Sequence, residues 1–152
     1  MKRYIKYYDS PIGIIEIIGT EEYILSVHFV EEKKESKEGI EIVENAYMQL
    51  DEYFNGVRKD FHINFYLEGT DFQKRVWNEL LEIPYGKTIS YQELAKNIGN
   101  EKAVRAVGGA NHKNNISIMI PCHRVIGKDG KLTGYGGGLW RKKWLIEHEK
   151  RF

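Results

Sequence analysis

The chain has 152 residues, enough for one sizeable domain together with a small second one. Its content of 41% hydrophobic and 30% charged residues indicates a globular protein and excludes collagenous, low-complexity and disordered classes. The single cysteine excludes an internal disulfide and a cysteine-rich zinc module, and we expect no cofactor. No apolar run approaches the roughly 20 residues of a membrane span, so we expect a cytoplasmic protein without a membrane partner.

The formal net charge of +1 is a sum over two unlike parts. Residues 1–66 hold 8 basic and 13 acidic residues, a net of −5, whereas residues 67–152 hold 15 and 9, a net of +6. Within residues 86–143 the balance is 11 basic against 3 acidic, a net of +8. Such a segment is typical of a surface that faces phosphates, although a solvated basic face beside an acidic neighbour would give the same count.

The first third of the chain is predicted to form a small antiparallel sheet with one helix. Alternating apolar residues on either side of turn-prone sequence predict three strands: residues 3–8, 13–18 and 23–29. The charged residues 31–38 have too little apolar content to pack and predict an exposed loop. Apolar residues at spacings of three and four predict a helix over residues 40–54, and residues 61–67 are consistent with a further short strand.

After residue 67 the pattern becomes helical, so we place a domain boundary there, with domains over residues 1–66 and 67–152. Thr70 is a candidate N-cap for a helix that ends before Pro84. Ser90 begins a capping-box sequence for a second, short helix ending at Gly99. Asn100 is expected to cap a third helix over residues 101–111, which gives a helix-turn-helix.

The last third is predicted to contain a short buried strand and a long helix. Residues 116–120 are continuously apolar except for Ser117 and predict a strand that runs into a Pro-Cys-His-Arg turn. The final helix is predicted over residues 139–150, with its inward face formed by these residues: Leu139, Trp140, Trp144, Leu145 and His148. The fold class is therefore α+β, with a mainly helical second domain.

Cys122 is the candidate nucleophile. A lone buried cysteine is usually an inert apolar residue. An adjacent imidazole at His123 and nearby cations favour the thiolate, which is the form that attacks carbon. His123 is the candidate base, and either Glu147 or Glu149 could orient it from the last helix.

Small residues fill the predicted third helix, where consecutive Gly108 and Gly109 each cost about 1 kcal/mol relative to alanine. Either the helix packs tightly within the protein, or it is pressed against another molecule with Arg105 projecting from it. The glycine run at residues 134–138 lacks a nucleotide-binding spacing. It is better suited to a loop that lines a pocket, with Tyr135 able to stack on a planar ligand.

The run Ile120-Pro121-Cys122-His123-Arg124-Val125-Ile126 resembles the active-site signature of the O6-alkylguanine-DNA alkyltransferases, also called methylated-DNA–protein-cysteine methyltransferases. The resemblance extends over residues 72–149 and includes residues 90–95, 105–111, 114 and 132–140. It implies a monomer that binds double-stranded DNA containing O6-alkylguanine. The implied activity is a single, irreversible transfer of the alkyl group to Cys122 with the damaged base flipped out, and O4-methylthymine is a second expected substrate.

The resemblance also implies a role for each matched residue. His123 would relay the thiol proton through water, with Glu149 as its orienting carboxylate. Tyr91 would donate to N3 of the base, and Asn114 would brace the turn before the active-site strand. The guanine pocket would be lined by Val125, Tyr135 and the backbone N–H of Gly136. Arg105 would replace the flipped nucleotide, while Ala106 and Gly109 would allow close approach to the minor groove.

Two other functions are consistent with parts of the same sequence. The first is a non-enzymatic lesion-binding protein of the alkyltransferase-like type, although those relatives lack the cysteine that stands here at position 122. The second is a helix-turn-helix regulator whose cysteine is structural. Only an alkyltransferase requires that the Cys122 thiol reacts with an alkyl donor, so the reactivity of this thiol distinguishes it from both alternatives.

Overall fold

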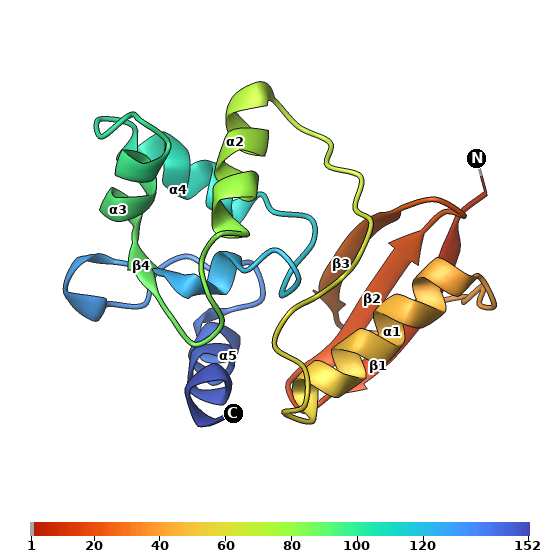
Figure 1. Ribbon diagram of the computed structural model, residues 1–152. Helices are drawn as coiled ribbons and strands as arrows, with labels where there is room; N and C mark the ends of the chain where they lie inside the picture. Colours follow the sequence, from red (N-terminus) through yellow and green to blue (C-terminus); the bar gives the residue numbers. More distant parts are fainter. Residues whose placement is uncertain (1) are drawn as a thin grey trace. The chain divides into compact units, whose positions relative to one another are not determined.

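The computed structural model describes residues 2–152 and divides into two compact units (Figure 1). The first unit contains residues up to 67 together with residues 115–119, and the second contains residues 68–114 and 120–152. From the sequence, residues 115–119 are expected in the second domain, whereas in the structure they group with the first unit. Val27 N donates to Asn115 O (2.9 Å) and Ser117 N donates to Val27 O (2.8 Å), so this segment is bonded to the first unit.

The first unit is a three-stranded antiparallel sheet with one helix packed on it. Its strands β1 (Tyr4–Ser10), β2 (Gly13–Gly19) and β3 (Ile24–Val30) lie in the order β1-β2-β3. Helix α1 (Glu41–Phe54) packs against β1 and β2 and buries these residues: Val43, Ala46, Leu50 and Tyr53. The predicted strands and helix are confirmed. Residues 61–67 contribute only an isolated bridge, between Phe65 and Ile24 of β3.

The second unit is mainly helical. Its helices are α2 (Asp71–Leu80), α3 (Tyr91–Asn97), α4 (Val104–His112) and α5 (Leu139–Arg151). Two-residue strands β4 (Ile89–Ser90) and β5 (Val125–Ile126) pair in parallel, and two 3-10 turns, η1 (Cys122–Arg124) and η2 (Lys128–Gly130), complete the unit. No helix within residues 2–152 is long and apolar enough to cross a membrane.

Helices α2, α3 and α4 pack against one another, as Figure 1 shows. Thr70 forms the predicted N-cap of α2 through a reciprocal capping box with Gln73. Trp77 of α2 donates its Nε1–H to Ala110 O of α4 (2.8 Å). These contacts join α2 to the helix-turn-helix formed by α3 and α4, which is the element that the sequence predicts.

Helix α4 begins three residues later than predicted. Asn100 is not its cap, because Ala103 occupies the N-cap position and donates its N–H to Asn100 O (3.0 Å) in the preceding turn. Gly99 makes the turn between the helices with a left-handed φ of 81°. The connection is therefore longer, and the helix shorter, than the small-residue pattern indicates.

The predicted strand over residues 116–120 is wrong. Ile116 forms an isolated bridge with Val27, the next three residues form a turn, and Ile118 adopts a left-handed φ of 72°. The apolar residues here are buried as a strand would be, so burial alone did not distinguish the two conformations. Cys122 consequently lies in the 3-10 turn η1, and the short strand β5 follows it.

The inward face of α5 also differs from the prediction. Leu139 and Trp140 are 48% and 58% exposed, whereas Lys142, Leu145, His148 and Glu149 are buried. Positions 142, 145 and 149 follow the three-and-four spacing of one helical face. That face carries a lysine and a glutamate into the interior of the second unit.

Candidate active site

Turn η1 places Cys122, His123 and Arg124 next to one another in the interior. Their residues are 6%, 0% and 7% exposed. The turn is closed by Arg124 N donating to Pro121 O (3.0 Å), and it packs against α2 and α5. Three consecutive polar side chains are thus buried together, which requires that each finds a partner.

Glu149 of α5 is the partner of two of them. Its Oε2 lies 2.6 Å from His123 Nε2 and accepts from Arg124 Nη2 (3.1 Å), while its Oε1 accepts from Arg124 Nε (2.8 Å) and from Gly86 N (3.2 Å). Burial alone would raise the pKa of this carboxyl group. The charge interaction and hydrogen bond with His123, followed by those with Arg124, outweigh burial and hold the pKa well below its ordinary value.

His123 is held as a neutral acceptor. Burial lowers the pKa of its imidazole, despite the opposite effect of Glu149. Because the Glu149 carboxylate can only accept, Nε2 carries the ring proton and Nδ1 has the free lone pair. Within residues 2–152, Nδ1 has no hydrogen-bond partner. Of the two carboxylates considered for this role, Glu149 contacts the histidine and Glu147 is exposed.

The pKa of the Cys122 thiol is raised overall, so the resting site does not favour the thiolate as the sequence suggests. Burial raises its pKa, while a hydrogen bond from the Asn114 side chain and the charge of Lys142 lower it. The Asn114 amide also donates to Ile120 O (2.8 Å), so it bridges the backbone before the turn and the sulfur. Asn111 of α4 donates to Cys122 O (3.3 Å) and holds the backbone of the residue.

Tyr91, the first residue of α3, lies beside the loop that precedes α5. Its hydroxyl donates to Thr133 O (3.1 Å), and Lys142 Nζ donates to the same carbonyl (2.7 Å) and lies 3.4 Å from the Tyr91 oxygen. Burial raises the pKa of the Tyr91 hydroxyl. Lys142 was missed by the sequence analysis, as were the roles of Asn111 and Arg124. The spacing of residues 142, 145 and 149 is the signal that could have found Lys142.

The residues assigned to a guanine pocket differ in accessibility. Val125 and Tyr135 are buried, and within residues 2–152 the Tyr135 hydroxyl has no hydrogen-bond partner. Gly136 is exposed, and a Cβ added there would meet no atom within 4 Å. The backbone N–H of Gly136 is therefore placed in an open part of the loop, beside a buried aromatic ring.

Helix α4 presents Arg105, Ala106 and Gly109 to solvent. Its opposite face is buried through Val107, Ala110 and Asn111. A Cβ added at Gly109 would meet nothing within 4 Å, and one at Gly108 would make ordinary contact with the Tyr91 ring at 3.8 Å. Packing within the protein therefore requires neither glycine. Of the two explanations for these glycines, this result favours the close approach of another molecule to the helix.

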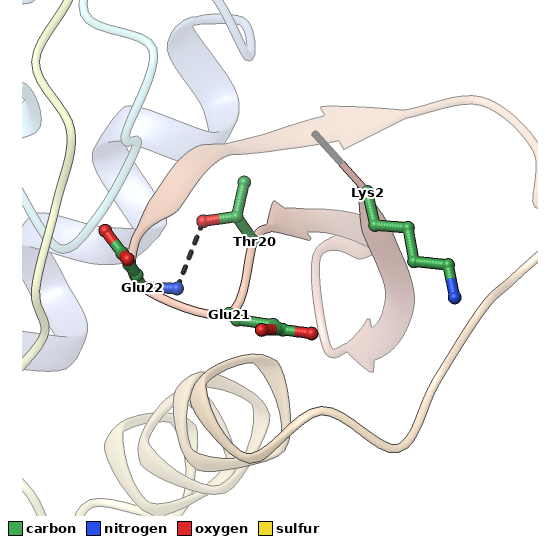
Figure 2. A pocket seen from close by; sticks show the side chains of 4 residues that line it. All are labelled: Lys2, Thr20, Glu21 and Glu22. Carbon is green, nitrogen blue, oxygen red and sulfur yellow. Dashed lines mark hydrogen bonds between the residues drawn. The ribbon is translucent and has the colours of Figure 1, made fainter.

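The first unit also has surface hollows, but their linings contain no candidate nucleophile or base. One is lined by Lys2, Thr20, Glu21 and Glu22, where Glu22 N donates to Thr20 Oγ1 (3.2 Å) (Figure 2). A second is lined by Glu21 again and by these residues of α1: Glu41, Ile42, Glu44, Asn45 and Met48. Neither lining includes a cysteine or a histidine, so the candidate site is the one around Cys122.

The fold and the site together define a class of protein: an α+β chain with a buried cysteine backed by a histidine–glutamate pair, beside a helix-turn-helix. Residues 71–151 match the family model described as 6-O-methylguanine DNA methyltransferase, DNA binding domain. Residues 3–67 match the ribonuclease-like domain of the same enzymes. The chain belongs to the 6-O-methylguanine DNA methyltransferase family.

Individual relatives agree over nearly the whole chain. The methylated-DNA–protein-cysteine methyltransferase of Methanosarcina acetivorans is 50% identical over 96% of this chain and 97% of its own length. The crystal structure of the Mycobacterium tuberculosis O6-methylguanine methyltransferase superimposes with a TM-score of 0.89 at 44% identity, covering 99% of this chain and 94% of that one. The crystal structure of Mycobacterium tuberculosis OGT in complex with DNA superimposes with a TM-score of 0.89 at 46% identity. It covers 97% of this chain and 92% of that one.

We expect Glu149→Gln to lower the free energy of unfolding at pH 7 by about 3 kcal/mol, because Arg124 keeps its charge in a buried site without an anion. The pKa of Glu149 is lower in the folded protein than in the unfolded chain. Its stabilisation is therefore complete above the ordinary value of 4.5 and is lost as the pH falls below it.

Guanidinium denaturation at several pH values measures this effect. The exposed neighbour Glu147→Gln is the matched control and should change the free energy by less than about 0.5 kcal/mol. Equal stability of the two variants at pH 7 would show that the network around Glu149 contributes nothing.

Proposed function

We propose that this protein repairs alkylated DNA by moving the alkyl group from O6 of guanine to the sulfur of Cys122. The observation that carries the proposal is the buried pair of His123 Nε2 and Glu149 at 2.6 Å, with His123 adjacent to Cys122 in the same turn and its Nδ1 without a hydrogen-bond partner among the described residues. A buried thiol with a base next to it can form a thiolate on demand. The names of the relatives at up to 50% identity support the same reaction.

The reaction is a displacement at an unactivated carbon. The Cys122 sulfur forms the new S–C bond as the C–O6 bond of guanine breaks, and the thiol proton passes through water to His123 Nδ1. Glu149 stabilises the imidazolium that results, because its carboxylate already accepts from Nε2. Asn114, which donates to the sulfur, keeps the nucleophile aligned for in-line attack.

The leaving guanine needs a proton and an electrostatic partner. In the proposed reaction the Tyr91 hydroxyl turns from Thr133 O to N3 of the base and gives it a proton, so that guanine leaves as a neutral molecule and the negative charge remains on the Tyr91 oxygen. The Gly136 N–H donates to O6, and Val125 and Tyr135 bound the base. No cofactor takes part in these steps.

DNA binds along α4 in this proposal. Of the 11 basic residues in segment 86–143 only Arg124 and Lys142 are buried, so most of its positive charge faces solvent. Arg105 would enter the base stack when the damaged nucleotide is flipped out, offsetting an unstacking cost of a few kcal/mol. Gly109 has no side chain and Ala106 has a small one, which supports a close approach of α4 to the DNA groove.

The central prediction is a single methylation. Incubation with excess duplex DNA containing O6-methylguanine should add one methyl group to Cys122, and repair should stop when it equals the amount of protein. Intact mass and peptide mapping measure the adduct, and Cys122→Ala should give none. Continued turnover, or full repair by Cys122→Ala, would rule out the proposal. The latter result would favour the lesion-binding alternative.

The same mass measurement with O4-methylthymine DNA tests the second expected substrate. If the Cys122 thiol does not react with O6-benzylguanine and the protein binds a specific DNA sequence, the helix-turn-helix regulator is the better interpretation. The monomeric state and the cytoplasmic location expected from the sequence stay predictions. Sedimentation of the purified chain tests the first.

Base flipping predicts a selective defect in Arg105→Ala. Methyl transfer from duplex DNA should slow about tenfold or more, since nothing would fill the gap left by the extruded base. Reaction with free O6-benzylguanine should keep its rate because no flipping is needed. Single-turnover rates on the two substrates measure the difference. Equal losses on both would mean that Arg105 does not assist flipping.

Gly109→Ala should separate stability from function. Alanine favours the helix by up to about 1 kcal/mol, and the added Cβ meets no atom of the protein, so the melting temperature should rise. Repair of duplex DNA should weaken by about tenfold because the same Cβ stands between α4 and the groove. The free-base reaction serves as the internal control. A stabilised variant with full duplex activity would place Gly109 outside the DNA contact.

A further inference from the structure

The glycine loop before α5 has few side chains of its own to keep it in one conformation. Residues 134–138 comprise four glycines and Tyr135, whose ring is buried. Glycine loses more conformational freedom on folding than any other residue, so such a loop is costly to order. The proposed reaction needs the loop ordered, because the Gly136 N–H must face guanine O6. Gly136 itself is exposed, and a Cβ added there would meet no atom within 4 Å.

Arg141 of α5 is bonded to this loop. Its Nη1 donates to Gly137 O at 2.8 Å, and its backbone N–H donates to Gly138 O at 3.2 Å. Within the loop, Gly138 N donates to Tyr135 O at 2.9 Å. The guanidinium therefore holds the carbonyl of the residue directly after Gly136, while the buried Tyr135 holds the residue before it.

The ring of Trp140 orients that guanidinium. Arg141 Cζ lies 4.6 Å from the centroid of the Trp140 ring, which is a cation–π distance. A Cβ added at Gly138 would lie 3.4 Å from Trp140 Cδ1, so the ring also lies against the end of the loop. From the sequence Trp140 is expected in the core, whereas it is 58% exposed and makes these contacts instead.

We propose that Arg141 is a positioning residue for the flipped base: stacked on Trp140 and bonded to Gly137 O, it keeps the Gly136 N–H in the place where guanine O6 is received. This inference rests on the proposed function, since it concerns the loop to which that function assigns the base. Arg141 touches no reacting atom. It acts on the free protein, because it reduces the loop ordering that base binding would otherwise have to supply.

The decisive measurement separates binding from chemistry in Arg141→Met. Only the ordered fraction of the loop binds the base, so the apparent affinity falls in proportion to that fraction. The concentration of free O6-benzylguanine that gives half the maximal single-turnover rate should therefore rise about fivefold, the effect of one lost hydrogen bond. The rate at saturation should stay within about twofold, because the bound base itself keeps the loop ordered.

The exposed Arg151 of the same helix supplies the matched control. Arg151→Met removes an equal charge and a similar ring contact, with Phe152 at 5.9 Å. It lies about 15 Å from Arg141 along the helix axis. Neither the half-saturating concentration nor the saturated rate should change in this variant.

A merely structural arginine predicts a different result. Arg141→Met would then melt earlier while both kinetic quantities of the folded protein kept their wild-type values, and this outcome would overturn the proposal. A lower saturated rate with an unchanged half-saturating concentration would refute it as well. If Arg141→Met fails to fold, Trp140→Leu decides, since it keeps the arginine and removes the ring that orients it. Its half-saturating concentration should rise at least about twofold, and a wild-type value would end the proposal.

Amide exchange of the loop allows the two proposals to fail separately. The Gly138 N–H, which is bonded to Tyr135 O, should exchange about fivefold faster in Arg141→Met without any substrate. Unchanged exchange in that variant would end only the role of Arg141. A wild-type protein that takes no methyl group from O6-methylguanine DNA would end the proposed function, whatever the exchange rate of the loop.

Discussion

The buried carboxylate of Glu149 is the group on which the arrangement of the site depends. It accepts from His123, from two nitrogens of Arg124 and from the backbone of Gly86. Arg124 in turn donates to Ile83 O (2.7 Å), in the segment that follows α2. One side chain thus ties α5 to η1 and to the chain between α2 and β4. A carboxylate so deeply buried would be unfavourable with any of these donors missing.

Arg124 also determines what His123 can do. A buried carboxylate beside an imidazole favours the imidazolium, which has no lone pair and cannot take a proton from the thiol. Burial is the largest influence on the pKa of His123 and lowers it against the effect of Glu149, and the charge of Arg124, which is paired with Glu149, lowers it further. The imidazole is then neutral, with its hydrogen toward Glu149 and its lone pair free. The arginine that follows the histidine in the sequence is therefore part of the reason that the histidine can act as a base.

The sequence predicted the elements that rest on local patterns. The three strands and α1 were readable because their alternation and three-and-four spacing directly reflect one buried face. Thr70 was readable as a cap because its bonds are to residues three positions away. The error at residues 116–120 has a different origin: a turn held by Val27 is non-local, and its buried isoleucines look like those of a strand.

Some residues of the candidate site were predicted from the sequence and others were missed, for a related reason. Cys122 and His123 adjoin one another, and the resemblance supplied Glu149, Tyr91 and Asn114. Nothing in the residue types distinguishes Lys142 from Lys143 or Arg124 from an exposed arginine, so all four counted equally toward the +8 of segment 86–143. Burial, which depends on the position of α5 in the fold, separates them: Arg124 and Lys142 lie inside and Lys143 is exposed.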